Sequence, residues 1–522
     1  MQHKKISQPL INGNISLGRI AFHGAFWNIS ITVINKVITT IGQILIAWFL
    51  VPGDLGLVAM AASINSIAAI FTANGLDDLL IQRHSKYNKD APQIFWISIC
   101  LNLFALMFVL LLTVLVTKHY GDVRIANLML IQAISWPFSS ISLVLVPKLR
   151  NQLRFKSLAI MNLGEGFIFT GSCVFFAAIG FGSYAMVWPI FIRTLFSALM
   201  SWWLVKKLPI NPPDTKKWLQ YLKPGSLLIL GNFISIITVQ LPIFIIGNML
   251  NENFTGIFSW GYLVSSQLVF LLAINLRGIF TPLFSKLNKS IKRRSKVIVK
   301  SLHILMTLVV PICVTQAFLA TPMIKMLFPV RWFPAIPVII WLSLGFVLQP
   351  VAVIAFSAFI AMGKNKTYFS TTLIQAGLIS FGVYLGCIEK DVEKIAKGAA
   401  LGMALCLPMY YLTLGKIVGA RTILKTLKPV IISALAGIPA YIVLLISNEN
   451  NSNLIYFETA TLYAVLLVVF SLCFDKDEMM HLYKVEIINI VNRMRKKNNM
   501  SWSDYRSNVR NVNGNNDLEG LK

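Results

Sequence analysis

Four ionisable residues stand well away from the ends of long apolar stretches of the sequence, where a charge is costly. They are Lys36 in "WNISITVINKVITTIGQILIAWF", Glu165 in "MNLGEGFIF", Arg193 in "WPIFIRTLFSALM" and Arg277 in "INLRGIFTPLFSK". In hydrocarbon such a group needs water, a counter-charge or a backbone partner. The three cations, gathered around a wet cavity, would bind an anionic group such as a phosphate. Glu165 could bind a proton or a cation, or act as a counter-ion for one of the basic groups.

The depth of these groups follows from the rise of 1.5 Å per residue along a helix. Arg193 lies about ten residues into its apolar run, and Glu165 lies about 12 Å from one end of its run. Arg277 stands roughly 12 Å from the basic loop 285–296, so its long side chain could also reach the interface. Arg277 therefore has two open interpretations, a cavity cation or an interfacial anchor.

Polar residues also recur along one face of the first apolar run, at steps of three or four. They are Asn28, Thr32, Asn35, Lys36, Thr39 and Gln43. These steps place them on one side of a helix. A polar stripe on a transmembrane helix faces water or protein rather than lipid. The stripe either lines a hydrated cavity or makes helix–helix contacts through small polar groups, and Lys36 favours the cavity.

The composition is that of an integral membrane protein. The 522 residues are 56% hydrophobic and only 13% charged, whereas soluble domains carry about 25% charged residues. The net charge of +27 is divided among short loops between apolar runs, as membrane topology requires, so it does not indicate nucleic acid binding. We therefore predict an all-α polytopic membrane protein.

Fourteen apolar runs are long enough to cross a bilayer, which takes roughly 20 residues. Their approximate limits are 24–50, 55–76, 92–117, 125–147, 157–180, 183–205, 225–250, 255–283, 302–329, 333–361, 367–388, 396–415, 429–447 and 454–474. With both termini in the cytoplasm, the inner segments hold 37 Lys and Arg residues and the outer segments 6. This asymmetry predicts that orientation.

A short internal repeat relates the two halves of the chain. The segment "AWFLVPGDLGLV" (47–58) resembles "GNMLNENFTGIF" (247–258), and Gly56 matches Gly256 at a shift of 200 residues. Six runs separate the copies, so both halves cross the membrane in the same sense. We predict two six-helix lobes around a central cavity, an alternating-access plan, followed by two helices and a partly disordered cytoplasmic tail. The predicted parts are 1–205, 206–415, 416–475 and 476–522.

Other motifs limit the chemistry. The sequence holds no GxxxxGK[ST], HExxH or GxSxG motif, and the outer loops are too short for a catalytic domain. The six cysteines form no CxxC pair, which gives no reason to expect a metal site. In "GLDDLLIQR", Asp77 and Asp78 directly precede a basic inner loop, so we interpret them as an interfacial elbow. We expect no enzyme and no cofactor; a proton or sodium gradient as the energy source is what the family resemblance described below implies.

The chain resembles the polysaccharide transporter family, the Wzx-type flippases of the multidrug/oligosaccharidyl-lipid/polysaccharide superfamily. The resemblance rests on "FHGAFWNISITVINKVITTIGQILIAWFLVPGDLGLVAMA", "GLDDLLIQR", "LVPKLRNQLRFKSLAIMNLGEG", "LRGIFTPLFSKL" and "FPVRWFPAIPVIIWLSLG". It covers roughly residues 20–415 and is nearest to the colanic-acid and teichuronic-acid exporter branch. Arg277 matches the family's arginine before an apolar-Pro-apolar run. Relatives usually lack paired acids at Asp77 and Asp78, and often carry an acid at the position of Asn162, one turn before Glu165.

This resemblance implies a V-shaped, two-lobed protein of the bacterial cytoplasmic membrane. It implies the movement of undecaprenyl-diphosphate-linked oligosaccharides to the outer leaflet, by alternating access through a cation-rich cavity, alongside polysaccharide polymerase machinery. Lys36, Arg193 and Arg277 would supply positive charge, with Asn28, Asn35 and Gln43 in the wall and Glu165 as a possible coupling acid. The alternatives are a lipid II or multidrug exporter of the same superfamily, or a membrane polysaccharide polymerase. Several cations beside one deep acid favour an anionic cargo.

Overall fold

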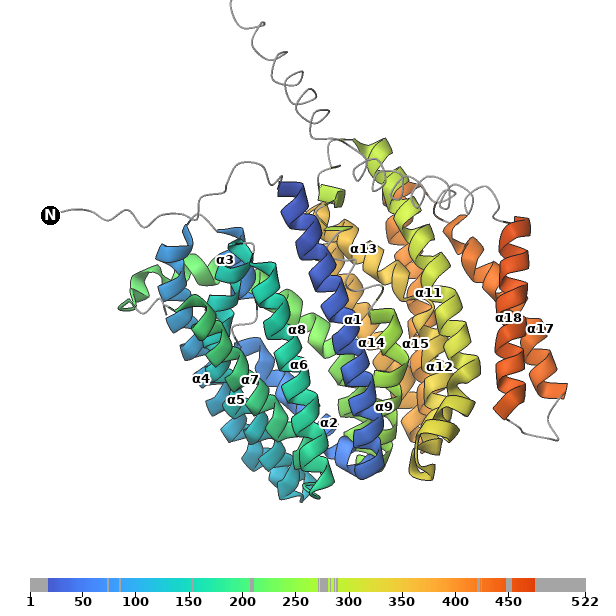
Figure 1. Cartoon of the computed structure of the whole chain (residues 1–522), viewed down its shortest axis with the longest axis horizontal. Helices are drawn as coiled ribbons and strands as arrows, with labels where there is room; N and C mark the ends of the chain where they lie inside the picture. Colours follow the sequence, from blue (N-terminus) through green and yellow to red (C-terminus); the bar gives the residue numbers. More distant parts are fainter. Residues whose placement is uncertain are drawn as a thin grey trace, which may run out of the picture. The chain divides into compact units, whose positions relative to one another are not determined.

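A computed structural model gives the architecture of the chain (Figure 1). It describes residues 17–72, 75–83, 86–152, 154–206, 211–270, 272, 280–281, 283–285, 287, 290–419, 423, 425–446 and 453–474. In these ranges the elements are helices: α1 (Leu17–Phe49), α2 (Pro52–Ala68), α3 (Leu76–Gln82), α4 (Tyr87–Tyr120), α5 (Val123–Asn151), α6 (Phe155–Ala178), α7 (Tyr184–Val205), α8 (Trp218–Met249), α9 (Glu252–Val269), α11 (Ile291–Leu327), α12 (Ile336–Phe346), α13 (Gln349–Ala361), α14 (Asn365–Ile388), α15 (Val392–Val418), α17 (Lys428–Ile446) and α18 (Asn453–Phe474). The prediction of an all-α membrane protein is confirmed.

Helices occupy all fourteen predicted apolar runs. Among the described residues, seven helices are long and apolar enough to cross a membrane, or nine when each of two bent pairs counts as one span. One pair is α1 with α2, bent by 118°, and the other is α12 with α13, bent by 44°. The apolar parts of α8, α17 and α18 are shorter, so the number of fourteen crossings stays a prediction.

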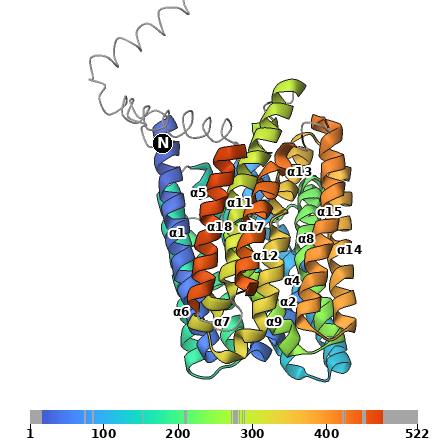
Figure 2. The same cartoon turned by 90° about the vertical axis from the view of Figure 1, so that its right-hand side faces the viewer.

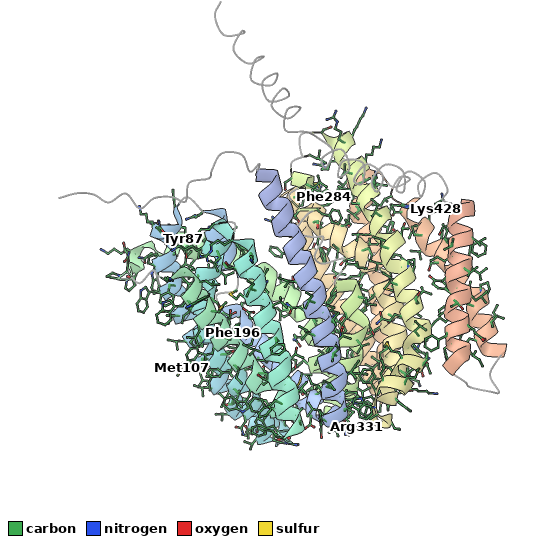
Figure 3. All side chains as sticks on the ribbon, viewed as in Figure 1. Tyr87, Met107, Phe196, Phe284, Arg331 and Lys428 are labelled. Atoms are coloured by element: carbon green, nitrogen blue, oxygen red, sulfur yellow. The ribbon has the colours of Figure 1, made fainter. Side chains whose placement is uncertain are left out.

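The contacts divide the chain into two compact units, Met1–Leu427 and Lys428–Lys522. In the second unit α17 packs against α18, and the hydroxyl groups of Ser433 and Tyr463 share a hydrogen bond. In the first unit Tyr87 and Phe284 lie near one end of the helices and Arg331 near the other (Figure 3). The boundaries of the two predicted lobes inside this unit stay a prediction.

The outward side chains of the long helices are apolar. On α4, Leu111 is 68% exposed and Val114 is 70% exposed, and Met107 and Leu115 are exposed as well. Soluble proteins rarely expose contiguous apolar patches of this kind, whereas lipid is a favourable solvent for them. This surface fits a multi-pass membrane protein.

Short turns at the predicted outer end are fixed by carboxylate or amide caps. The side chains of Asp122, Asn251 and Asp391 accept hydrogen bonds from the first-turn amides of α5, α9 and α15. Such caps satisfy amides that have no partner within their helix. A hydrogen bond from the Arg124 guanidinium also holds the pKa of the Asp122 carboxyl below its usual value. With these caps, a turn of only a few residues is enough to reverse the direction of the chain.

The two copies of the internal repeat cross each other at their glycines. Helices α2 and α9 lie side by side in both views (Figures 1 and 2). A Cβ atom at Gly56 would lie 1.7 Å from the carbonyl oxygen of Glu252, and one at Gly256 would lie 1.8 Å from that of Pro52. The contact is reciprocal, because residues 52 and 56 correspond to 252 and 256 at the shift of the repeat. Only glycine allows the two backbones to approach so closely.

We expect Gly56→Ala and Gly256→Ala to lower the thermal stability of the purified protein by similar amounts. Each methyl group would push against backbone atoms, and such overpacking costs about 1–3 kcal/mol. Gly377→Ala is the matched control, because nothing lies within 4 Å of a Cβ atom at that helical glycine. Thermal unfolding in detergent measures the effect. Unfolding temperatures equal to that of the control would contradict the close crossing.

Candidate functional site

A cavity of about 660 Å³ lies between helices from the two halves of the chain. Its walls come from α1, α2 and α7 on one side and from α8 and α9 on the other. Lys36 is the one charged group among the described residues that line it, and the polar neighbours are Ser259, Tyr262, Ser266 and Gln267. The remaining lining is mostly apolar. A single ammonium group in a mostly apolar cavity of this size favours an anionic ligand group.

The Lys36 side chain is half-buried, and the described residues offer it no ion pair. Its carbonyl oxygen accepts a hydrogen bond of 3.0 Å from the Thr39 hydroxyl one turn later. The ammonium group is therefore not neutralised by a neighbouring carboxylate in this part of the structure. Its charge is available to a ligand in the cavity.

Gln43 and Asn35, on the same helix as Lys36, contact different neighbours. The side-chain amide of Gln267 on α9 donates a hydrogen bond to the side-chain oxygen of Gln43. This bond joins α1 to the α9 wall of the cavity. The Asn35 amide donates to the Asn162 backbone oxygen of α6 at 3.1 Å. Gly166 faces Asn35, and a Cβ atom there would come within 2.5 Å of the Asn35 side-chain oxygen. The polar stripe thus contains helix-packing and cavity-facing residues.

Of the other predicted ionisable residues, Arg193 and Glu165 are described by the structure, and neither lines the cavity of Lys36. Arg193 is exposed on α7, with its guanidinium 5.3 Å from the centre of the Phe169 ring on α6. Glu165 is half-buried on α6 and forms no ion pair within the described residues. Arg277 and the side chain of Asn28 lie outside the described residues. The roles assigned to these four residues stay predictions.

The paired acids lie on the short helix α3. Gly75 adopts a left-handed conformation with φ of 105° and begins this helix, which buries Leu76, Leu79 and Leu80 fully or nearly so. Desolvation, and then the charge of Asp77, raise the pKa of the Asp78 carboxyl, and Arg150 opposes this rise. The helix is held to the protein by its leucines, which leaves its acids outside the cavity lining.

Sequence reasoning missed the contribution of α9 to the cavity. Ser259, Tyr262 and Ser266 follow one another at steps of three and four residues, and Gln267 is adjacent. This is the same kind of stripe as on α1, which could have revealed it. It carries no charge and is interrupted by apolar residues, so it does not stand out from ordinary helix-packing positions.

Hydrogen bonds fasten the two halves beside this cavity. The Trp332 indole donates to the Ala47 carbonyl oxygen at 2.9 Å, and the Arg331 guanidinium donates to the Trp48 carbonyl oxygen at 2.5 Å. In return, the Trp48 indole donates to the Leu327 carbonyl oxygen at 2.9 Å. These donors satisfy carbonyl groups at the end of α1 that have no partner within their helix. The second half of the chain therefore caps the first.

Residues 45–337 match the family described as polysaccharide biosynthesis protein. The chain belongs to this family. It is 22% identical over 348 residues to the succinoglycan biosynthesis transport protein ExoT of Rhizobium meliloti (strain 1021), covering 66% of this chain and 70% of that protein. The predicted membership of the polysaccharide transporter family is confirmed, and the colanic-acid and teichuronic-acid branch stays a prediction.

Solved transporter structures share the fold. The lipid II flippase MurJ in an inward closed conformation matches with a TM-score of 0.65 at 15% identity, over 86% of this chain and 98% of that chain. An inward-facing multidrug resistance MATE family transporter of the MOP superfamily matches with a TM-score of 0.53 at 14% identity, over 74% of this chain and 95% of that one. This polysaccharide biosynthesis protein therefore shares its fold with these two transporters.

Because Lys36 lines the cavity, we predict that water reaches position 36 more easily than position 37, the next residue on α1. In a variant without the six native cysteines, we expect Lys36→Cys to react with a charged methanethiosulfonate reagent. We expect Val37→Cys, on the exposed apolar face of α1, to react at least about tenfold more slowly, because the thiolate form requires water. Labelling rates in membrane vesicles measure this. Equal rates at the two positions would contradict a hydrated cavity at Lys36.

Proposed function

We propose that this polysaccharide biosynthesis protein moves a polyprenyl-diphosphate-linked oligosaccharide across the bacterial cytoplasmic membrane, from the inner to the outer leaflet. The observation that carries the proposal is the cavity between the two halves, with Lys36 in its wall and no ion pair to Lys36 from any described residue. A diphosphate with attached sugars cannot enter hydrocarbon unaided, so its passage needs a cavity with fixed positive charge. The lipid tail would remain in the bilayer.

The comparisons support this class of cargo. One relative is named as a transport protein of succinoglycan biosynthesis, and one structure with the same fold is named as a lipid II flippase. Lipid II is the second candidate cargo. A multidrug exporter for cations would use acids in its cavity, and the described lining holds a lysine instead. A polymerase would need a large outer loop, and the described outer turns, such as 121–122 and 250–251, are very short.

The proposed cycle is alternating access with both termini in the cytoplasm. The two halves would turn about the α2–α9 crossing, where the backbones already touch. Glu165 is the proposed site for coupling to a proton or sodium gradient, and Arg193 and Arg277 are the proposed further cations on the route of the head group. Polysaccharide polymerase machinery on the outer side is the proposed partner that consumes the product.

The test is a lipid extraction from host cells depleted of this protein, followed by mass spectrometry of the undecaprenyl-diphosphate pool. We expect a completed oligosaccharide unit to accumulate on the lipid and the surface polymer to disappear. The measured mass identifies the cargo. An unchanged pool together with monomeric units on the outer leaflet would show intact translocation and would reopen the polymerase interpretation.

In the same cells we expect Lys36→Met to restore surface polymer about 10- to 100-fold less well than the wild type. This range corresponds to the loss of one hydrogen bond to a charged group, worth about 1.5–3 kcal/mol. Lys325→Met is the matched control, because Lys325 is exposed near the end of α11 and does not line the cavity. Immunoblotting of membranes checks that all variants are present in equal amounts. Equal restoration by both variants would contradict the role of Lys36.

A further inference from the structure

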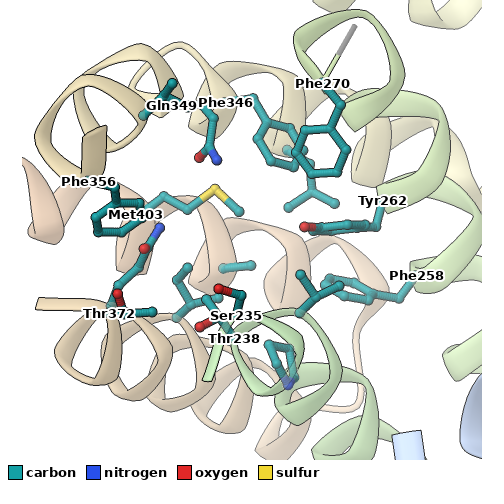
Figure 4. Close-up of a pocket in the computed structure, with 17 residues that line it drawn as sticks. Ser235, Thr238, Phe258, Tyr262, Phe270, Phe346, Gln349, Phe356, Thr372 and Met403 are labelled. Atoms are coloured by element: carbon teal, nitrogen blue, oxygen red, sulfur yellow. The ribbon is translucent and has the colours of Figure 1, made fainter. Parts of the chain in front are cut away.

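A second pocket of about 160 Å³ lies within the second half of the first unit (Figure 4). It is enclosed by α8, α9, α12, α13, α14 and α15. Figure 4 shows Tyr262 and Phe258 on one side, Phe356 and Thr372 opposite, and the Met403 side chain reaching between them. A cavity needs about 10–15 Å³ by this measure to hold one water, so the pocket has room for about ten non-hydrogen atoms.

The lining of this pocket combines aromatic rings with neutral hydrogen-bonding groups. Phe346, Phe356 and Tyr262 supply rings, and Gln349 and Gln375 supply amides. None of the described residues that line it is a Lys, Arg, His, Asp or Glu. A phosphate or an organic cation would therefore find no counter-charge here, and burying either without one is costly.

The amides in the pocket have hydrogen-bonding capacity to spare. The Gln349 side chain makes no hydrogen bond to any other described residue. The Gln375 side-chain oxygen accepts a hydrogen bond of 2.8 Å from the Tyr410 hydroxyl, which leaves its N–H groups for another partner. A hydrocarbon chain in this pocket would leave these groups unpaired, at a cost of about the full desolvation of an amide. The lining fits a ligand with hydroxyl groups and an apolar face.

This pocket adjoins the cavity of Lys36. Val239, Tyr262 and Phe270 line both spaces, so a ligand group in one lies a single layer of side chains from the other. A molecule that carries a phosphate and a neutral hydroxylated ring could place one in each space. The cavity has Lys36 for the phosphate, and the described lining of the pocket is neutral, as the ring requires.

We propose that this pocket binds a neutral glycosyl residue of the cargo while the Lys36 cavity holds the diphosphate. The proposal rests on the proposed function and adds a sugar subsite to it. A glycosyl ring has an apolar face that packs against Tyr262 and the phenylalanines, and hydroxyl groups that pair with Gln349 and Gln375. A charged sugar is excluded, because the pocket offers it no counter-charge.

The test uses the full chain in lipid nanodiscs and saturation-transfer NMR with methyl glucoside and methyl galactoside as probes. We expect signal transfer to at least one glycoside from the wild type, reduced about fivefold or more in the double variant Gln349→Leu/Thr372→Val. Thr371→Val is the matched control. Thr371 and Thr372 are both 2% exposed and both bond backbone oxygens of their own helix, but only Thr372 lines the pocket. The Thr371→Val variant keeps the full signal.

A wild-type protein without signal transfer to either glycoside, or an equal signal in the double variant, would overturn the proposal. If the double variant does not fold, Thr372→Val alone provides the same comparison with Thr371→Val, since the two substitutions change side-chain size very little. Undecaprenyl phosphate, which has no sugar, is the second probe. We expect Lys36→Met to weaken its binding and the pocket variants to leave it unchanged. Equal phosphate binding by Lys36→Met would count against the proposed function, independently of the sugar subsite.

Discussion

The reciprocal contact of Gly56 and Gly256 is the constraint on which the arrangement of the first unit depends. Each glycine lies against a carbonyl oxygen of the opposite repeat, at distances that no side chain allows. The contact fixes α2 against α9. A turn of two residues joins each of these helices to the one before it, 50–51 between α1 and α2 and 250–251 between α8 and α9. In the proposed alternating-access cycle, this crossing is the point about which the two halves would turn.

The cavity follows from this crossing. Helices that meet closely at one point separate along the rest of their length, and larger side chains or water must fill the space. Lys36 lies about four helical turns before the end of α1, and at this level it lines the cavity. The hydrogen bonds of Trp332, Arg331 and Trp48 hold the other end together. The ammonium group lies in the wall of this cavity, and the two halves are joined at the far end of α1.

The sequence predicted the helices and the internal repeat, but it predicted neither the contact between the two glycines of the repeat nor the full lining of the cavity. Apolar length and the 200-residue repeat are strong local signals, so the runs and the glycine pair were found. The lining of the cavity comes from two helices that are far apart in the sequence, so no local pattern reveals it. Asn35 and Lys36 are adjacent in the stripe, yet Asn35 bonds α6 and Lys36 faces the cavity. Gln267 and Tyr262 carry no charge, and only their position opposite α1 reveals them. The 44° bend between α12 and α13 coincides with Pro350 in the first turn of α13, a local signal that apolar periodicity does not record.

Two adjoining spaces of different character give the protein a way to discriminate between cargoes. A charged cavity alone would accept any polyprenyl diphosphate, because the diphosphate is common to all of them. A neutral pocket that pairs hydroxyl groups rejects ligands that leave Gln349 and Gln375 unpaired, since unpaired buried amides are costly. Release requires that neither site bind strongly, and dividing recognition between a charge and a set of neutral hydrogen bonds keeps each contribution modest. In the proposed function, selectivity for the sugar would reside in the second half of the chain, and general affinity for the head group would reside at its junction with the first.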